Sequence, residues 1–150
     1  MSIQSKHILI VEPKPYTQLI LLLILRKFGY MVTTAGDLLS ALGIIGSFKN
    51  THRQVDILLT NIRMFDSSWD NESLSVPVFF DELDRSRNGL NVLIMKDAKP
   101  NQPKLQHFPN KDYIEFIDTP STLEDLGLKI RRIFERKIIY GREQEKPVLQ

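Results

Sequence analysis

The chain has 150 residues, which is enough for one domain with a buried core, and it contains no cysteine, so disulfides and thiolate metal sites are excluded. The 20 basic and 18 acidic residues give a formal net charge of +2, which predicts no direct attraction to nucleic acid or to an anionic membrane. The longest apolar run, residues 19–25, is too short to span a bilayer, so we expect a cytoplasmic protein.

Three histidines, His7, His52 and His107, are scattered along the chain without the spacing of metal ligands. We therefore predict that they are ordinary surface or loop residues and that no metal site involves them.

The first half of the chain alternates predicted strands and helices. Residues 7–11 are rich in branched apolar side chains and predict a strand buried on both faces, which the prolines at positions 13 and 15 end. The segments that follow are a helix over residues 16–28 with Gly29 as its C-terminal stop, a strand over 30–34, a helix over 38–48 with Asp37 as its N-cap, and a strand over 55–59.

The second half continues the alternation after a polar, acidic loop at residues 66–75. A helix over 77–87 and a strand over 90–95 precede residues 96–110, where three prolines predict an irregular segment. A strand over 113–117 and a long helix over 123–140 complete the pattern, and we expect a domain over residues 1–140 with a polar C-terminal tail over 141–150.

Five strand–helix alternations favour an α/β sandwich with a parallel sheet and right-handed crossovers. In such folds the working site lies beyond the carboxyl ends of the strands. Four places are therefore candidates for the site: Glu12–Pro13, Thr60–Asn61, residues 95–97 and residues 118–120.

Five ordered motifs carry a resemblance to a known family. They are 8-ILIVEP-13, 25-LRKFGYMV-32, 56-DILLTNIRMF-65, 92-VLIMKD-97 and 116-FIDTPSTLEDL-126. Together, over about residues 6–136, they resemble the CheY-like receiver domain of bacterial response regulators. The resemblance implies a flavodoxin-like (βα)5 three-layer sandwich with a five-stranded parallel sheet.

The resemblance also assigns places in the family's phosphoacceptor pocket. Asn61 stands in the place of the phosphoacceptor aspartate, and Glu12 and Pro13 stand where two acidic residues hold magnesium. Lys96 stands in the place of the family's hydroxyl residue, and Thr119 stands in the place of its lysine. Phe116 stands in the place of the switch aromatic. A shift of one residue would put Asp97 in the hydroxyl place, but it would also push a lysine into an apolar strand position, so Lys96 is preferred.

These substitutions predict a degenerate pocket without phosphotransfer. The amide of Asn61 is neutral and is a poor nucleophile, and Glu12 alone supplies less carboxylate charge than magnesium favours. We expect no catalytic residue, no metal and no cofactor, so the chain is predicted not to be an enzyme.

Two interpretations of the pocket remain open. In one, a Glu12–Lys96 ion pair, supported by Asn61, replaces the metal and phosphate charges and locks the switch. In the other, the pocket has decayed and these residues only satisfy one another at the edge of the sheet.

The predicted function is a phosphorylation-independent, receiver-like signalling module of a two-component phosphorelay system that acts by protein–protein interaction. The alternative is a phosphoaccepting receiver that uses magnesium and another carboxylate, although Asp56 opens its strand at the wrong end and Asp66 lies in the loop. The predicted partner is a signalling protein or an output module, and a homodimer is an open alternative.

Three surfaces have both a binding and a structural interpretation. The apolar run 19–25 indicates either a partner face or deeper burial. The aromatic residues Phe65 and Trp69 indicate either a contact surface or a cap on the core edge. A late cationic cluster in the last helix indicates either a docking stripe or a solvated face; it consists of Arg131, Arg132, Arg136, Lys137 and Arg142.

Overall fold

The computed structural model describes residues 6–65, 75–96, 108–119 and 122–145, with side chains up to residue 136. It divides into two compact units, Met1–Thr119 and Pro120–Gln150. The first unit contains one sheet and its covering helices, and the second contains one long helix, α4 (Leu123–Glu145). Several residues named above lie outside the described part: Asp66, Trp69, Asp97, His107 and Pro120, together with the side chains of Lys137 and Arg142.

The sheet has five parallel strands in the order β2-β1-β3-β4-β5, so the predicted α/β fold with a five-stranded parallel sheet is confirmed. Its strands are β1 (His7–Val11), β2 (Met31–Ala35), β3 (Ile57–Asn61), β4 (Asn91–Lys96) and β5 (Ile114–Asp118). This order is the doubly wound, flavodoxin-like one, in which the strand order reverses between β1 and β3.

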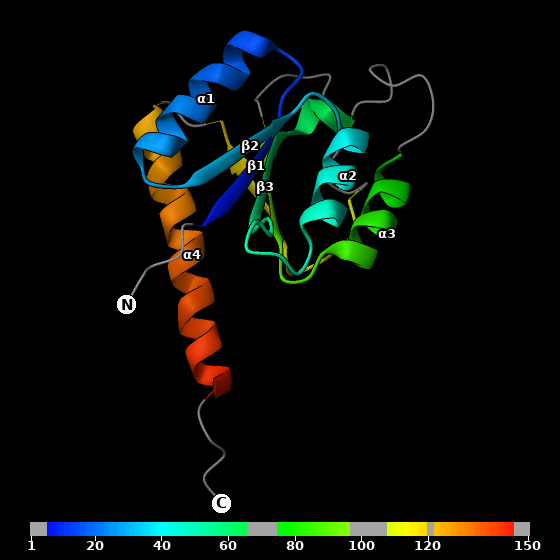
Figure 1. Cartoon of the computed structure of the whole chain (residues 1–150), viewed down its shortest axis with the longest axis vertical. Coiled ribbons are helices and arrows are strands. Elements are labelled where there is room, and N and C mark those ends of the chain that lie inside the picture. Colours follow the sequence, from blue (N-terminus) through cyan, green and yellow to red (C-terminus); the bar gives the residue numbers. More distant parts are fainter. Residues whose placement is uncertain (1–5, 66–74, 97–107, 120–121, 146–150) are drawn as a thin grey trace, which may run out of the picture. The chain divides into compact units, whose positions relative to one another are not determined.

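Helices cover both faces of the sheet in the first unit. Helix α1 (Pro15–Lys27) lies on one face, and α2 (Leu38–Phe48) and α3 (Val76–Ser86) lie on the other, as Figure 1 shows. A short 3-10 helix, η1 (Ile62–Phe65), follows β3 directly. Three layers are therefore present within this unit alone.

Alternation of side chains along β1 explains how one strand supports both faces. Leu9 and Val11 belong to the core cluster formed with α2 and α3. Ile8 and Ile10 point to the opposite face and are just as fully buried. Burial on both faces accounts for the continuous apolar run from which this strand was predicted.

Local signals in the sequence place the helix ends correctly. Asp37 caps α2, because its Oδ1 accepts a hydrogen bond of 2.7 Å from the backbone N–H of Ser40. Gly29 has φ of +93°, and its N–H donates to the carbonyl of Arg26 at 2.9 Å after the last turn of α1.

Other boundaries differ from those predicted. Strand β3 continues to Asn61 rather than ending at Leu59, because the polar residue Thr60 is buried and donates its hydroxyl to the carbonyl of Val11 at 3.2 Å. Helix α4 continues to Glu145, five residues beyond the predicted end. Within the described residues, no helix is both long and apolar enough to cross a lipid bilayer.

The apolar run 19–25 in α1 is divided between core and surface. Leu21 and Leu25 are buried, whereas Leu19 and Leu23 are 52% and 56% exposed. The run is therefore not buried as a whole, and the interpretation of its outer side as a contact face stays open.

The prediction for His7 was wrong. Its side chain is buried at the start of β1, with Nδ1 2.6 Å from the carbonyl oxygen of Arg53 and Nε2 2.7 Å from Oγ1 of Thr33. The carbonyl accepts only, so Nδ1 carries a proton and the neutral ring accepts from Thr33 at Nε2. Burial lowers the pKa of His7 below its ordinary value.

Candidate functional site

The predicted site residues lie together where the carboxyl ends of the strands meet. This end of the sheet, at which all five parallel strands finish, is its carboxyl edge. The register pairs Val11 with Thr60, Asn61 with Met95, and Lys96 with Asp118. Glu12 directly follows Val11, so the residues after β1, β3, β4 and β5 lie at the same edge, where the fold reverses its strand order. The predicted location of the site is therefore consistent with the topology.

Asn61 is the last residue of β3, and it is half-buried. Its side-chain Oδ1 accepts a hydrogen bond of 2.9 Å from the backbone N–H of Arg63. This bond from residue i+2 forms an Asx turn that starts η1. The amide at the phosphoacceptor place thus has a structural partner in the turn that follows it.

Glu12 is also engaged by its own loop. Its Oε1 accepts a hydrogen bond of 3.1 Å from the backbone N–H of Lys14, the residue that precedes α1. The adjacent Pro13 is exposed and has no side-chain oxygen to offer a metal. The loop after β1 therefore contributes one carboxylate, and one of its oxygens already has a partner.

Gln18 is a residue at this edge that the sequence reasoning did not identify. From the first turns of α1 its Nε2 donates to the carbonyl oxygens of Glu12 at 3.0 Å and of Ala35 at 3.3 Å. The backbone N–H of Glu12 donates to the same carbonyl of Ala35 at 2.9 Å. Gln18 therefore ties the ends of β1 and β2 together, a role that no local pattern signals because Ala35 is 17 residues away from Gln18 in the sequence.

Lys96 pairs with Asp118 rather than with Glu12. Its Nζ lies 3.8 Å from Oδ1 of Asp118, whose side chain is 87% exposed. Both Glu12 and Lys96 are among the described residues, and no ion pair joins them there, so the contacts do not show the Glu12–Lys96 pair of the first interpretation. The register explains the difference, since Lys96 lies directly opposite Asp118 on the neighbouring strand.

Thr119 closes the end of the β4–β5 ladder. Its backbone N–H donates to the carbonyl of Lys96 at 2.9 Å, and its hydroxyl donates to the same oxygen at 3.2 Å. A threonine therefore joins the backbone at the place where the resemblance puts a lysine, and Lys96 is a cation at this edge.

Asp118 is a carboxylate at this edge to which the sequence reasoning gave no role. Residues 118–120 were predicted to be one of four candidate places for the site, but only Thr119 was given a role there. The signal for Asp118 was the same as for Asn61, namely a polar residue directly after an apolar strand run. Its pairing with Lys96 depends on the strand register, which the sequence does not show.

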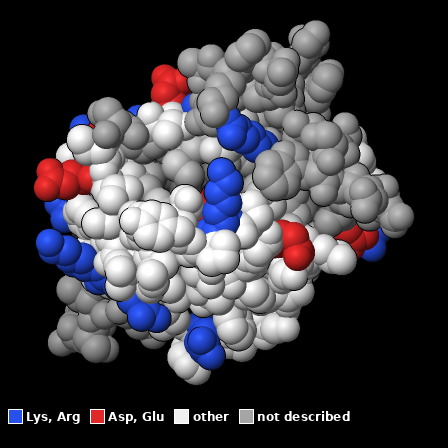
Figure 2. All heavy atoms as spheres, turned by 90° about the horizontal axis from the view of Figure 1, so that it is seen from above, with Lys and Arg blue, Asp and Glu red and all other residues white. Residues whose placement is uncertain are grey.

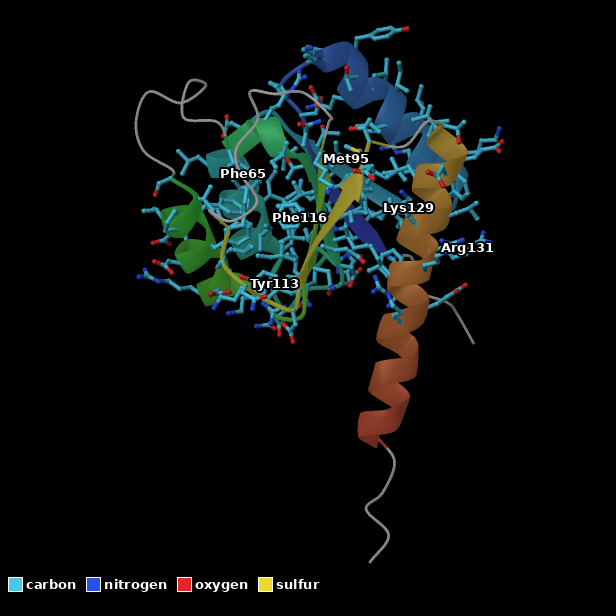
Figure 3. The ribbon with its side chains drawn as sticks, turned by 180° about the vertical axis from the view of Figure 1, so that it is seen from behind. Phe65, Met95, Tyr113, Phe116, Lys129 and Arg131 are labelled. Carbon is cyan, nitrogen blue, oxygen red and sulfur yellow. The ribbon has the colours of Figure 1, made fainter. Side chains whose placement is uncertain are left out.

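Phe116 connects β5 to the turn after Asn61 through aromatic contacts. Its ring lies edge-on to that of Phe108, with centroids 5.1 Å apart, and Phe108 lies edge-on to Phe65 at 5.1 Å. Phe65 is the last residue of η1 and is buried. Of its two interpretations, a contact surface or a cap on the core edge, its burial supports the position in the core. Figure 3 labels Phe65 and Phe116, together with Met95 near the carboxyl end of β4 and Tyr113 at the opposite edge of the sheet.

Asp56 lies at the opposite, amino edge of the sheet. Its Oδ2 accepts a hydrogen bond of 2.8 Å from the backbone N–H of His7, the first residue of β1. Its own N–H donates to the carbonyl of His7 at 2.8 Å. The expectation that Asp56 sits at the wrong end to serve this site is confirmed.

Charge is scattered at the surface. Seen from above, Figure 2 shows Lys and Arg side chains separated by uncharged surface, with Asp and Glu side chains between them. In the part of the chain that the structure describes, no group of three or more His, Cys, Asp or Glu side chains is placed to hold one metal ion.

Comparisons with solved structures identify the fold. A response regulator receiver domain protein from Clostridium thermocellum matches with a TM-score of 0.66 and 20% identity, over 90% of this chain and 98% of its own. The signal receiver domain of an HD domain-containing protein from Pseudomonas fluorescens matches with a TM-score of 0.69 and 17% identity, over 98% and 97%. The chain has the fold of a response regulator receiver domain.

A third match is the inactive form of the regulatory domain of a repressor of iron transport regulator, with a TM-score of 0.66 and 22% identity, over 87% of this chain and 96% of that one. No family model and no curated protein matches the sequence. At these identities the shared property is the fold, and the chemistry of the site must be argued from this chain's own residues.

Proposed function

We propose that this protein is a receiver-like signalling module that acts by binding another protein and does not use phosphorylation as its input. The observation that carries the proposal is Asn61 at the end of β3, with its amide oxygen bonded to the N–H of Arg63. An acyl phosphate forms by attack of a carboxylate on phosphorus, and an amide at this position has neither the charge nor the nucleophilicity to do so.

The oxygen donors at the edge do not fit a magnesium site. Magnesium favours octahedral oxygen ligands with carboxylate charge, but Glu12 is the one carboxylate after β1 and one of its oxygens accepts from Lys14. Pro13 offers no ligand, and Asn61 offers a neutral oxygen that is already bonded. We therefore propose that the module works without magnesium and is not an enzyme.

Of the two interpretations of the pocket, the contacts support the decayed one. Glu12 is bonded to its own loop, Asn61 to the next turn, and Lys96 to the neighbouring strand. Each group is satisfied locally, and no charge network crosses from β1 to β4 among them. Such contacts stabilise this end of the sheet. They do not form a switch with a second conformation that a bound phosphate would favour.

The neighbours' descriptions support a protein partner. One is described as a receiver domain of an HD domain-containing protein, and another as the regulatory domain of a repressor. Both are therefore parts of larger signalling proteins. By analogy of fold, we propose that this chain also contacts a signalling protein or an output module.

The test is incubation of the chain with a small-molecule phosphodonor, such as acetyl phosphate, and magnesium, followed by intact mass measurement. We expect no phosphate adduct. A stoichiometric adduct that hydroxylamine removes would overturn the proposal, because that lability marks an acyl phosphate. The exposed carboxylate variant Asp37→Asn is a matched control for nonspecific labelling, since Asp37 caps α2 and lies outside the site residues.

A second candidate function is favoured by one observation, the exposed carboxylate of Asp118 beside the Lys96 ammonium. A carboxylate with a neighbouring cation at this edge has the charge that phosphoryl transfer needs. The same experiment on Asp118→Asn decides between the candidates. An adduct on the unaltered chain that disappears in Asp118→Asn would establish a phosphoaccepting receiver with a displaced acceptor.

A further inference from the structure

The turn between α3 and β4 contains Asn88 and Gly89, the one Asn–Gly pair in the sequence. Both residues are exposed and have positive φ, 40° for Asn88 and 85° for Gly89. Asn and Gly are the residues that adopt this left-handed backbone most readily, so the turn explains why they are present. It does not explain what surrounds the Asn88 side chain.

Side-chain amides enclose Asn88 at the amino edge of the sheet. Its Nδ2 donates to Oδ1 of Asn50 and to Oε1 of Gln54, both at 2.8 Å. Gln54 in turn donates from Nε2 to the carbonyl of Asn88 at 3.0 Å, and its Oε1 also accepts from the N–H of Asn50 at 3.0 Å. The three residues form an amide cluster, defined as Asn50, Gln54 and Asn88, that joins the loop before β3 to the loop before β4.

The Asn–Gly pair has a defined spontaneous chemistry. The backbone nitrogen of Gly89 attacks the side-chain carbon of Asn88, a new C–N bond closes a succinimide ring, and the former amide nitrogen leaves as ammonia. Solvent takes the proton from the Gly89 nitrogen and gives one to the departing amide nitrogen, and one water then opens the ring to aspartate or isoaspartate. Glycine favours the attack because it has no side chain to hinder it.

The amide cluster opposes this reaction in the folded state. Both Nδ2 hydrogens of Asn88 are engaged, so rotating the amide toward the Gly89 nitrogen breaks two hydrogen bonds. Ammonia must also leave from the same nitrogen. Two such bonds slow the reaction by about tenfold or more.

We propose that Asn88 is a site of spontaneous deamidation and that Asn50 and Gln54 restrain its rate while the protein is folded. The inference does not depend on the proposed signalling function. The modification replaces the donating amide by a carboxylate that faces the Asn50 and Gln54 oxygens, which are acceptors, so the cluster is broken and the two loops are released from each other.

The product also disturbs the entry to β4. Leu90 follows Gly89 directly, is fully buried, and donates its N–H to the carbonyl of Arg87 at 2.9 Å to close the turn. Isoaspartate adds one methylene to the backbone inside this turn. Deamidation would therefore loosen a buried strand end, and it would do so irreversibly.

The test follows Asn88 by peptide mass spectrometry while the full chain is held in mildly alkaline buffer. We expect conversion of Asn88 in guanidinium chloride to be about tenfold or more faster than in the folded chain. We also expect folded Gln54→Ala to convert faster than the unaltered folded chain. If Asn88 does not convert in the unfolded chain, the site is wrong, and if Gln54→Ala leaves the folded rate unchanged, the restraint is wrong.

A control separates the cluster from a general loss of stability. Val32→Ala removes buried apolar contacts in β2 and does not touch the cluster. If Val32→Ala accelerates conversion as much as Gln54→Ala at matched stability, global opening sets the rate and the proposal fails. A selective effect of Gln54→Ala supports it.

A second measurement examines the consequence of modification. Asn88→Asp reproduces the aspartate product, and Asn88→Ala removes the donors without adding charge. We expect amide hydrogen exchange in residues 50–54 to increase in both variants, and more in Asn88→Asp. Unchanged exchange in both variants would overturn the claim that the cluster joins the two loops.

Discussion

Asn61 shows how far a single position can be interpreted from the sequence. The motif placed it correctly at the end of β3, and the charge it lacks was evident from the residue type. Its partner was not evident, because the N–H of Arg63 is presented by the 3-10 turn that follows. Hydrogen bonds of this kind depend on backbone geometry, which residue spacing does not specify.

The cap formed by Asn61 predicts different effects for two substitutions. Asn61→Ala removes the acceptor for the Arg63 N–H and should lower the free energy of unfolding by about 1 kcal/mol. Asn61→Asp keeps an acceptor oxygen and should be close to the unaltered chain. Urea unfolding measures both, and equal stability of all three proteins would contradict the capping role.

His7 was assigned wrongly because its neighbours are remote in the sequence. Thr33 and Arg53, whose atoms contact its ring, are 26 and 46 residues away. The spacing of the histidines was used to argue against a ligand set, and that spacing contains no information about burial. The first residue of a strand can have a buried polar side chain when hydrogen-bond partners for that side chain are present, as Arg53 and Thr33 are for His7.

His7 predicts that stability falls under mild acid. Burial lowers its pKa in the folded state, so below the ordinary value of 6.5 the unfolded chain binds a proton that the folded chain does not. The hydrogen bond to Arg53 and the charge of Asp56 oppose this shift, and burial outweighs them. Stability is therefore fully present above pH 6.5 and is lost as the pH falls from there toward the lowered pKa.

Unfolding free energies across this pH range, compared with those of His7→Gln, measure the effect. The His7→Gln protein should be less stable at neutral pH and should have a shallower dependence on pH below 6.5. His52→Gln is the matched control, because His52 is exposed. Identical pH profiles for His7→Gln and the unaltered chain would show that His7 does not cause the dependence.

At the scale of elements, periodicity and turn chemistry carried most of the prediction. In the part of the chain that the structure describes, the five strands and four α-helices occur where apolar runs and caps predicted them, and Asp37 caps its helix as expected. The errors fall at the ends. β3 continues through Thr60 because the buried Thr60 hydroxyl donates to a carbonyl of the neighbouring strand β1. The sequence alone predicted an earlier end, because a polar residue after an apolar run usually marks the end of a strand.

Phe65 illustrates an element whose role depends on tertiary contacts. It stands after Asn61 at the end of η1, and its ring contacts Phe79, Phe80 and Phe108 with centroids 5.1–5.9 Å apart. Aromatic contacts of this kind join η1, α3 and β5 on one face of the sheet. A composition of eight phenylalanines indicates a large apolar core but not which rings meet.

Loss of this ring should be costly. Phe65→Ala removes a buried aromatic side chain and should lower the free energy of unfolding by about 3–5 kcal/mol. Tyr16→Ala is the control, because Tyr16 on α1 is 76% exposed and should change stability little. Urea unfolding compares them, and a small effect of Phe65→Ala would mean that η1 is not fixed by the aromatic contacts.

At the scale of the whole molecule, the parallel sheet decides where chemistry is placed. Because all strands point the same way, the residues after β1, β3, β4 and β5 meet at one edge whatever they are. The order of elements was therefore enough to predict which residues meet at this edge. It was not enough to pair the residues there, since Lys96 finds Asp118 through the β4–β5 register and Glu12 finds Lys14 within its own loop.

Ligand linkage provides a whole-molecule test of the proposed loss of chemistry. A ligand that binds only the folded state stabilises it by an amount that grows with its concentration over Kd, about 2.7 kcal/mol at a hundredfold excess. The edge offers magnesium one carboxylate from the loop after β1 and a neutral amide from β3, so magnesium should leave the thermal midpoint unchanged. Sodium chloride at equal ionic strength controls for general salt effects.

The converse experiment restores the missing charges. The double variant Pro13→Asp with Asn61→Asp gives the ends of β1 and β3 three carboxylates, counting Glu12, on residues that the fold already brings together. We expect its thermal midpoint to be lower than that of the unaltered chain without magnesium, because like charges repel, and to rise when magnesium is added. If the unaltered chain responds to magnesium as strongly as the double variant, the metal site has survived, and the proposal that this fold signals without it is wrong.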